Sequence, residues 1–131
     1  MGERLWLQAV WVGIGGFAGS ALRFCVGYGL LRWFPTAAFP WGTLTVNVLG
    51  TAAMGYLAGV EELRETLGPS LRLLCITGLL GGFTTFSAFG WETLALVRDQ
   101  QVPRAAVYVA ASLLLGGAGV TAGFWLARVT T

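Results

Sequence analysis

Long uncharged runs are the feature that most constrains this chain. Four stretches contain no Asp, Glu, Lys or Arg, namely residues 5–22, 33–60, 73–91 and 105–127. A helix needs about 20 apolar residues to cross the ~30 Å hydrocarbon layer of a bilayer. Each run has that length or nearly that length, so the sequence predicts four transmembrane helices. We place them at about residues 5–34, 38–60, 70–97 and 103–128, within a single domain covering residues 1–131.

The composition excludes most soluble classes of protein. Hydrophobic residues make up 56% of the chain and charged residues 11%, whereas a soluble domain carries about 25% charged residues. The mean hydropathy is +0.72. The chain has no His and no Lys, which removes the commonest general base and every lysine nucleophile. We therefore expect no enzyme. The eight arginines form no basic cluster, so we expect no nucleic-acid partner.

Proline and charged residues separate the predicted spans. The prolines are Pro35, Pro40, Pro69 and Pro103. All four fall in or beside the polar connections at residues 32–40, 61–72 and 98–104, where helices are expected to end. The first four residues carry no net positive charge, so we expect a retained first span rather than a cleaved signal peptide. The predicted fold class is an all-α integral membrane protein.

The arginines outside the spans are almost evenly divided between the two sides of the membrane. Four spans place the N-terminus, the connection at 61–72 and the C-terminus on one side. That side carries Arg4, Arg64, Arg72 and Arg128, and the other carries Arg32, Arg98 and Arg104. An excess of positive charge is what orients a membrane protein. The near balance leaves two interpretations open: a weakly specified orientation, or insertion in both orientations.

Small and polar residues form stripes on two of the predicted helices. The stripe of the first span is Gly16, Gly19, Arg23 and Gly27, and that of the fourth is Tyr108, Ser112, Gly116, Gly119 and Gly123. Such stripes allow helix backbones to approach closely in lipid. The hydroxyls of Tyr108 and Ser112 lie one turn apart on one face, so we expect them to face a partner helix or a hydrated path.

Arg23 and Asn47 are polar side chains within predicted spans. A guanidinium in this position either extends towards the membrane surface or forms an electropositive vestibule that attracts anions. An Asn in the middle of a span needs hydrogen-bond partners, because hydrocarbon offers none. Asn47 therefore either joins two helices or donates hydrogen bonds to an anion.

The segment from Thr77 to Glu92 is poor helix-forming material for the middle of a span. It contains three glycines before two adjacent threonines, so the sequence predicts a broken third helix. Unwound backbone at membrane depth survives where it lines a cavity or contacts protein. Phe86 and Phe89, on a face shared with Phe83, form either a lipid-facing row or a row of positive ring edges for an anion.

Three motifs in these segments resemble the Fluc (CrcB) fluoride channels over nearly the whole chain. The motifs are Gly15-Gly16-x-x-Gly19-x-x-x-Arg23, Gly42-Thr43-Leu44-x-Val46-Asn47-x-x-Gly50, and Thr77-Gly78 followed by Gly81-Gly82-Phe83-Thr84-Thr85-Phe86-Ser87-x-Phe89. The resemblance implies a passive channel that exports fluoride across the inner (plasma) membrane and so relieves fluoride toxicity. It also implies a multi-pass protein that assembles as an antiparallel, dual-topology homodimer with two pores.

The resemblance also implies roles for individual residues. The fluoride pore would be lined by Asn47, Phe86, Phe89, Ser87, Thr85, Tyr108, Ser112 and Glu92. Arg23 would belong to the vestibule. Backbone carbonyls of Gly81 and Thr84 would hold a structural Na⁺ at the dimer interface. The partners implied are fluoride, Na⁺, membrane lipid and a second copy of the chain.

The main alternative is a small four-helix multidrug or cation exporter. Proton-coupled export needs an ionisable group within the membrane, commonly a carboxylate in the first span. Residues 5–34 contain Arg23 but no Asp or Glu. A subunit of a membrane assembly without transport activity is a third interpretation. Such a subunit would not need glycines followed by Thr-Thr-Phe-Ser.

Overall fold

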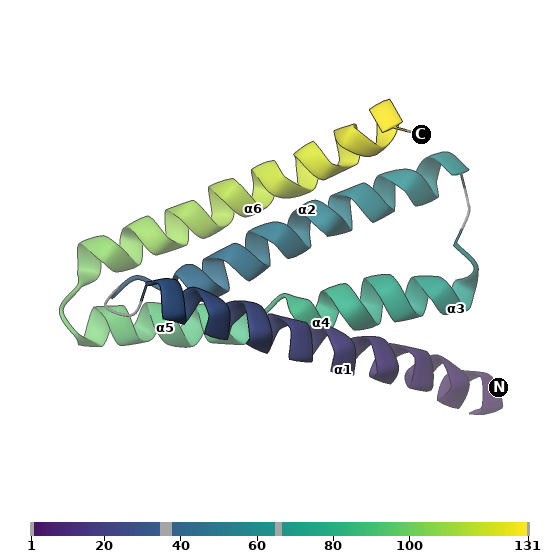
Figure 1. Ribbon diagram of the computed structural model, residues 1–131, viewed down its shortest axis with the longest axis horizontal. Helices are drawn as coiled ribbons and strands as arrows, with labels where there is room; N and C mark the ends of the chain where they lie inside the picture. Colours follow the sequence, from purple (N-terminus) through teal and green to yellow (C-terminus); the bar gives the residue numbers. More distant parts are fainter. Residues whose placement is uncertain (1, 35–37, 65–66, 131) are drawn as a thin grey trace.

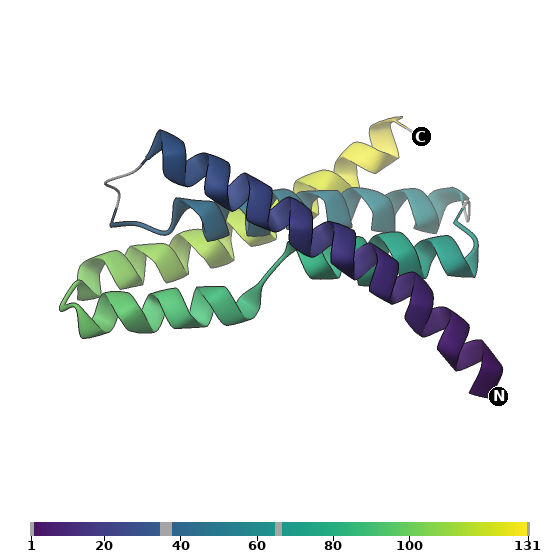
Figure 2. The same ribbon diagram turned by 60° about the horizontal axis from the view of Figure 1, so that its bottom comes forward.

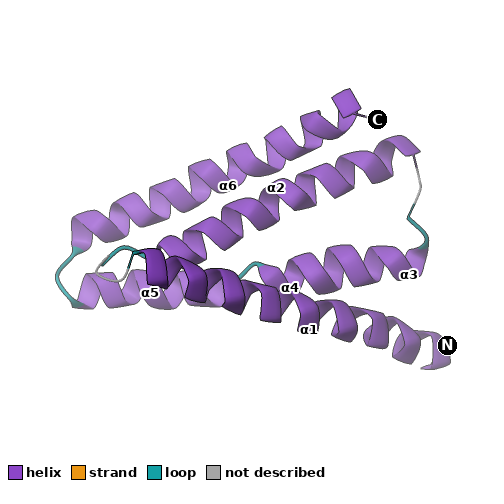
Figure 3. Cartoon of the chain, viewed as in Figure 1, coloured by secondary structure: helices purple, strands orange, loops and turns teal. Residues whose placement is uncertain are grey.

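The computed structural model describes residues 2–34, 38–64 and 67–130, and every regular element within these ranges is a helix (Figure 3). The chain order is α1 (Gly2–Trp33), α2 (Trp41–Arg64), α3 (Pro69–Arg72), the π-helix η1 (Leu73–Leu80), α4 (Gly81–Phe83), α5 (Phe86–Arg98) and α6 (Val102–Thr130). The elements α3, η1 and α4 follow one another without a gap and form one rod.

Four helical stretches are long and apolar enough to cross a membrane. They are Arg4–Trp33, Trp41–Arg64, Pro69–Arg98 and Val102–Thr130. The predicted all-α class is therefore confirmed, as are four helices capable of spanning a membrane. The second helix begins at Trp41 rather than at residue 38. Pro40 explains this start, because a proline disfavours the helical conformation of the residue before it.

The helices lie in two pairs that diverge from one another (Figure 1). Helix α6 runs beside α2, whereas α1 crosses the rod formed by α3, η1 and α4. Both termini and the α2–α3 connection lie at one end, and the α1–α2 and α5–α6 connections lie at the other. Large apolar side chains point outwards, for example Phe17 at 79% and Leu114 at 73% exposure. An apolar surface this extensive belongs in hydrocarbon rather than in water.

Glycines bring α2 and α6 into backbone contact. A Cβ atom added at Gly55 would lie against the carbonyl oxygen of Val120, and one at Gly123 against the carbonyl oxygen of Ala52, both closer than real Cβ atoms approach. In lipid, association of this kind depends on van der Waals contact between closely approaching backbones. For Gly123 the sequence-based interpretation of the fourth-span stripe as a packing surface is confirmed.

Glycines also bring the first span into backbone contact with the third. A Cβ atom at Gly15 would meet the carbonyl oxygen of Leu74, and one at Gly19 would meet that of Leu79. Both contacts fall on η1, so the glycines of α1 hold the first half of the third span at short range.

We expect Gly55→Ala to destabilise the protein, because α2 and α6 would have to separate to admit a methyl group. Overpacking of this kind costs about 1–3 kcal/mol. The matched control is Gly117→Ala on α6, since an added Cβ there meets nothing within 4 Å. Thermal unfolding in detergent should show a lower Tm for Gly55→Ala and an equal or higher Tm for Gly117→Ala. Equal Tm values for Gly55→Ala and the unaltered protein would contradict this account of the packing.

Two extended residues separate α4 from α5. Helix α4 ends at Phe83 and α5 begins at Phe86. Thr84 has φ −81° and ψ 157°, and Thr85 has φ −149° and ψ 121°. Figure 2 shows this step as the thin connection between the two helices. We call these two residues the Thr84–Thr85 step.

The glycines before this step behave differently from the expectation. Gly81 is helical, with φ −63° and ψ −38°, so the extended conformation belongs to the threonines. Gly82 instead serves close contact, since a Cβ atom there would lie 2.6 Å from the carbonyl oxygen of Gly16 on α1. The predicted common face of Phe83 with Phe86 and Phe89 is wrong, because Phe83 belongs to α4, before the step. Its ring is buried.

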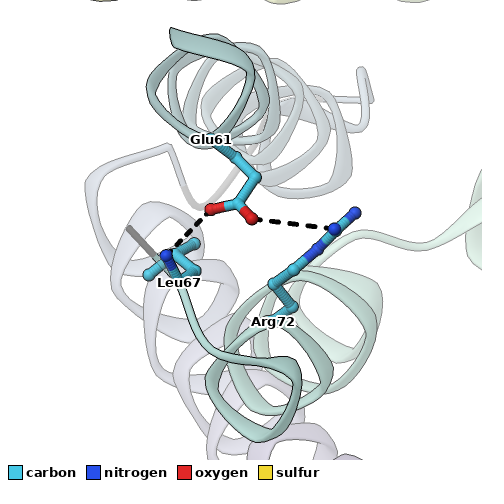
Figure 4. A network of polar contacts seen from close by, with 3 residues as sticks. All are labelled: Glu61, Leu67 and Arg72. Atoms are coloured by element: carbon cyan, nitrogen blue, oxygen red, sulfur yellow. Dashed lines mark hydrogen bonds and ion pairs between the residues drawn. The ribbon is translucent and has the colours of Figure 1, made fainter. Parts of the chain in front are cut away.

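The α2–α3 connection is held by one carboxylate (Figure 4). Glu61 accepts a hydrogen bond from the Leu67 amide at 3.0 Å and lies 3.6 Å from the Arg72 guanidinium. The Glu61 side chain is only 14% exposed, whereas that of Arg72 is 57% exposed. A half-exposed ion pair contributes little to stability. The main effect of Glu61 is therefore to fix the start of the third span relative to α2.

Candidate functional site

A cavity of about 280 Å³ lies between α2, the Thr84–Thr85 step, α5 and α6. Its lining consists of Asn47, Gly50, Thr51, Met54, Thr84, Thr85, Phe86, Phe89, Ser112, Leu113 and Gly116. Hydroxyl, amide and aromatic side chains therefore meet at one place, and no charged residue is among them. We call this space the step cavity.

Asn47 joins α2 to the Thr84–Thr85 step through both ends of its carboxamide. Its Nδ2 atom donates to the carbonyl oxygen of Thr85 at 3.0 Å, and its Oδ1 atom accepts from the Thr85 amide at 2.7 Å. Thr85 is 8% exposed, so these backbone groups need partners within the protein. Of the two roles considered for Asn47, the structure displays the helix-joining contact. The carboxamide retains one further N–H for another acceptor.

The hydroxyls of Thr84 and Thr85 form hydrogen bonds at the end of α4 and at the start of α5. The Thr84 hydroxyl donates to the carbonyl oxygen of Leu80 at 3.0 Å, and the Thr84 amide donates to the same oxygen at 3.0 Å. The Thr85 hydroxyl accepts from the Ala88 amide at 3.2 Å and so caps the start of α5. Ser87 lies 3.3 Å from the Thr85 hydroxyl.

A second polar group surrounds the Glu92 carboxylate. The Thr43 hydroxyl donates to Glu92 Oε1 at 2.7 Å, and the Tyr108 hydroxyl donates to Oε2 at 2.6 Å. Tyr108 is fully buried. A carboxylate in such surroundings is stable only when donors satisfy its oxygens. Thr43 was not among the predicted site residues, although it precedes Asn47 by about one helical turn on the same face.

Aromatic rings connect the two polar groups. The ring centroids of Phe86 and Phe89 are 5.5 Å apart, and those of Phe89 and Tyr108 are 5.3 Å apart. Phe39, which was not among the predicted site residues, meets Tyr108 edge-on at 5.5 Å. Phe86 is 83% exposed on the single chain. A row of rings thus leads from the outer surface of α5 past Tyr108.

Arg23 is not among the residues that line the step cavity. It is half-buried on α1 and lines a cavity of about 400 Å³ to which Thr43, Thr85 and Glu92 also contribute. Thr85 lines both this space and the step cavity. Ser112 lines the step cavity, and its buried hydroxyl oxygen has no hydrogen-bond partner among the described residues. A buried hydroxyl without a partner is costly unless it gains one.

The structure brings together most of the side chains selected from the sequence. Five of them line the step cavity: Asn47, Thr85, Phe86, Phe89 and Ser112. Ser87 is exposed and reaches the group through Thr85. Glu92 and Tyr108 are hydrogen-bonded to each other outside the step cavity. Of the residues chosen for their carbonyls, Thr84 lines that cavity, whereas Gly81 is exposed on α4.

Fold and site together define a small multi-pass membrane protein in which uncharged polar groups converge on a non-helical step. The family model described as "CrcB-like protein, Camphor Resistance (CrcB)" matches residues 10–124, and the chain belongs to this family.

Curated relatives agree with this family over nearly the whole chain. A protein of Methylobacillus flagellatus is 43% identical over 123 residues, which are 94% of this chain and 96% of that protein. A protein of Rhodospirillum centenum is 46% identical over 117 residues, 89% of this chain and 92% of its own. A protein of a Roseiflexus species is 41% identical over 94% of this chain and 98% of its own. Each of the three is named "Fluoride-specific ion channel FluC".

Proposed function

We propose that the chain forms a fluoride-selective passive channel that exports fluoride and so relieves its toxicity. The observation that carries the proposal is the step cavity, where an amide, hydroxyls and two phenyl rings converge without a charged group. The names of the relatives support fluoride as the ion. A channel requires no catalytic residue, which agrees with a chain that has no His and no Lys.

The chemistry of the cavity suits a small, strongly hydrated anion. Removing water from fluoride is the main barrier, so a pore must replace the hydration shell without holding the ion too tightly. Asn47 and Ser112 offer donors, and the edges of Phe86 and Phe89 carry partial positive charge. Each contact is weak and none carries a full charge. Arg23 in the neighbouring cavity would attract anions towards this path.

The functional unit in this proposal is an antiparallel homodimer with two pores. Phe86 is a ring of the proposed pore, yet it is 83% exposed on a single chain. A partner that covers α5 would turn this open row of rings into an enclosed path. The balanced arginines are compatible with two opposite orientations. The dimer would lie in the inner (plasma) membrane as a multi-pass protein surrounded by lipid.

Dual topology should be directly visible with reporter fusions. A C-terminal fusion to a reporter active on one side of the membrane, and a second fusion to a reporter active on the other side, should both give signal. The physical reason is the near-even division of arginines between the two ends of the bundle. Signal from one side alone, without an orienting partner, would contradict dual topology.

Na⁺ is the structural ion that the proposed dimer would hold. The end of an α-helix leaves its last carbonyls without amide donors from the same helix. Helix α4 ends at Phe83, and both Gly81 and Thr84 lie at that end. Backbone carbonyls without a carboxylate suit a monovalent cation better than Ca²⁺, which usually takes carboxylate ligands. The residues present therefore fit the ion, which would link the two subunits and add positive potential near both pores.

Flux from liposomes tests the proposed function. Purified protein in liposomes should release trapped fluoride down its gradient without a proton gradient. Proton-dependent uptake of a cationic drug, with no fluoride release, would favour the small multidrug or cation exporter. Neither flux would favour a membrane subunit without transport activity. Both of these results would refute the channel.

A further inference from the structure

The Thr84–Thr85 step redirects two backbone amides away from their helical acceptors. In an uninterrupted α-helix, each amide donates to the carbonyl four residues earlier. The Thr85 amide would then bond to Gly81, and the Ala88 amide would bond to Thr84. In this structure both amides donate to side chains instead.

The first of these side chains is Asn47. Its Oδ1 atom takes the Thr85 amide at 2.7 Å, so the carbonyl of Gly81 loses its helical donor. The same carboxamide donates from Nδ2 to the Thr85 carbonyl at 3.0 Å. Two bonds to the backbone of one residue, one from its amide and one to its carbonyl, fix Thr85 in both position and orientation. Asn47 thereby prevents Thr85 from continuing α4.

The second side chain is that of Thr85 itself. Its hydroxyl takes the Ala88 amide at 3.2 Å, so the carbonyl of Thr84 loses its helical donor. This hydroxyl sits on a residue that Asn47 already holds. The two interactions therefore form a chain in which Asn47 fixes Thr85, and Thr85 caps α5.

We propose that the Asn47 carboxamide and the Thr85 hydroxyl are positioning residues that keep the carbonyls of Gly81 and Thr84 open to a cation. The inference rests on the Na⁺ site within the proposed function, and it assigns to Asn47 and Thr85 a task separate from contact with fluoride. Their side chains would not touch Na⁺. They act by accepting hydrogen bonds from the amides of Thr85 and Ala88. In a continuous helix these two amides would bond to the carbonyls of Gly81 and Thr84.

The most informative variants remove or retain one acceptor at a time. Asn47→Ala removes the acceptor for the Thr85 amide, which is then free to bond to Gly81. Thr85→Val replaces the capping hydroxyl with a methyl group of similar size, whereas Thr85→Ser keeps the cap. Thr43→Val is a matched control on α2, because Thr43 bonds to Glu92 rather than to the step.

The measurement is the thermal stability of purified protein in detergent as Na⁺ replaces a large organic cation at constant ionic strength. The Tm of the unaltered protein should rise with Na⁺ concentration, because a ligand that binds the native state stabilises that state. Asn47→Ala and Thr85→Val should need about tenfold more Na⁺ to reach half of the rise in Tm, or should show no rise at all. A tenfold change equals about 1.4 kcal/mol, the size of one net hydrogen bond. Thr85→Ser and Thr43→Val should retain the response.

Three results would overturn the inference. Unaltered protein could show no Na⁺ response, Asn47→Ala and Thr85→Val could respond like it, or Thr85→Ser could lose the response as Thr85→Val does. Elution of each variant as one species at high Na⁺ verifies folding, and Thr85→Val tests the idea even where Asn47→Ala does not fold. Fluoride flux of the unaltered protein separates the two failures. Flux without a Na⁺ response refutes this inference alone, and a Na⁺ response without flux refutes the channel alone.

Discussion

Phe86→Ile and Phe89→Ile should each remove fluoride flux while the dimer still assembles. Isoleucine keeps an apolar side chain of substantial size but has no positive ring edge. Both rings line the step cavity, and their centroids lie 5.5 Å apart. We expect a loss of about tenfold or more in the rate of fluoride efflux, because each 1.36 kcal/mol added to a barrier slows passage tenfold.

The matched control for these variants is Phe17→Ile. Phe17 is 79% exposed on α1 and is not among the residues that line either cavity. Its replacement should leave fluoride efflux unchanged, and size-exclusion chromatography should show the same assembly for all three variants. Unchanged efflux in both Phe86→Ile and Phe89→Ile would show that the two rings serve packing alone.

Removal of Na⁺ is the second change with a large expected effect. If Na⁺ links two subunits through the carbonyls of Gly81 and Thr84, long dialysis into a large organic cation should abolish fluoride flux or loosen the dimer. Carbonyls enclosed between two subunits without a partner would be costly, and the pores would lose a nearby positive charge. Efflux and dimer content are measured before dialysis, after it, and after Na⁺ is restored.

A sodium gradient provides the control for this experiment. A static ion should support flux at equal Na⁺ on both sides, so reversing the gradient should not reverse fluoride movement. Equal efflux and equal dimer content in Na⁺ and in the organic cation, after complete exchange, would refute the structural role of Na⁺.

Sequence reasoning was strongest where hydrocarbon imposes a simple requirement. A span needs about 20 apolar residues, so the uncharged runs located all four helices within a few residues. Asn47 and Thr85 were also accessible to prediction, because polar groups at membrane depth must find partners. The sequence could not tell which partner each would take. Asn47 bonds to a backbone 38 residues away, a pairing that depends on how the helices pack.

The details of the step illustrate the same limit. The glycines at residues 81–82 predicted a weak point in the helix. In the structure, Gly82 instead allows close contact between α4 and Gly16 of α1. A glycine needed for close contact and a glycine needed for an unusual backbone angle look identical in a sequence. Phe39 was missed for a related reason. It lies in a connection, and its edge-on contact with Tyr108 depends on the fold.

Fluoride-selective conduction is tested most directly by following two anions in the same vesicles. Liposomes that contain the purified protein are loaded with potassium fluoride and potassium chloride, and valinomycin is added so that K⁺ can leave with either anion. Ion-selective electrodes then report both effluxes. The proposed channel predicts rapid release of fluoride driven by its gradient alone, with chloride retained as in protein-free vesicles. Release of both anions at similar rates, or retention of fluoride, would contradict the account.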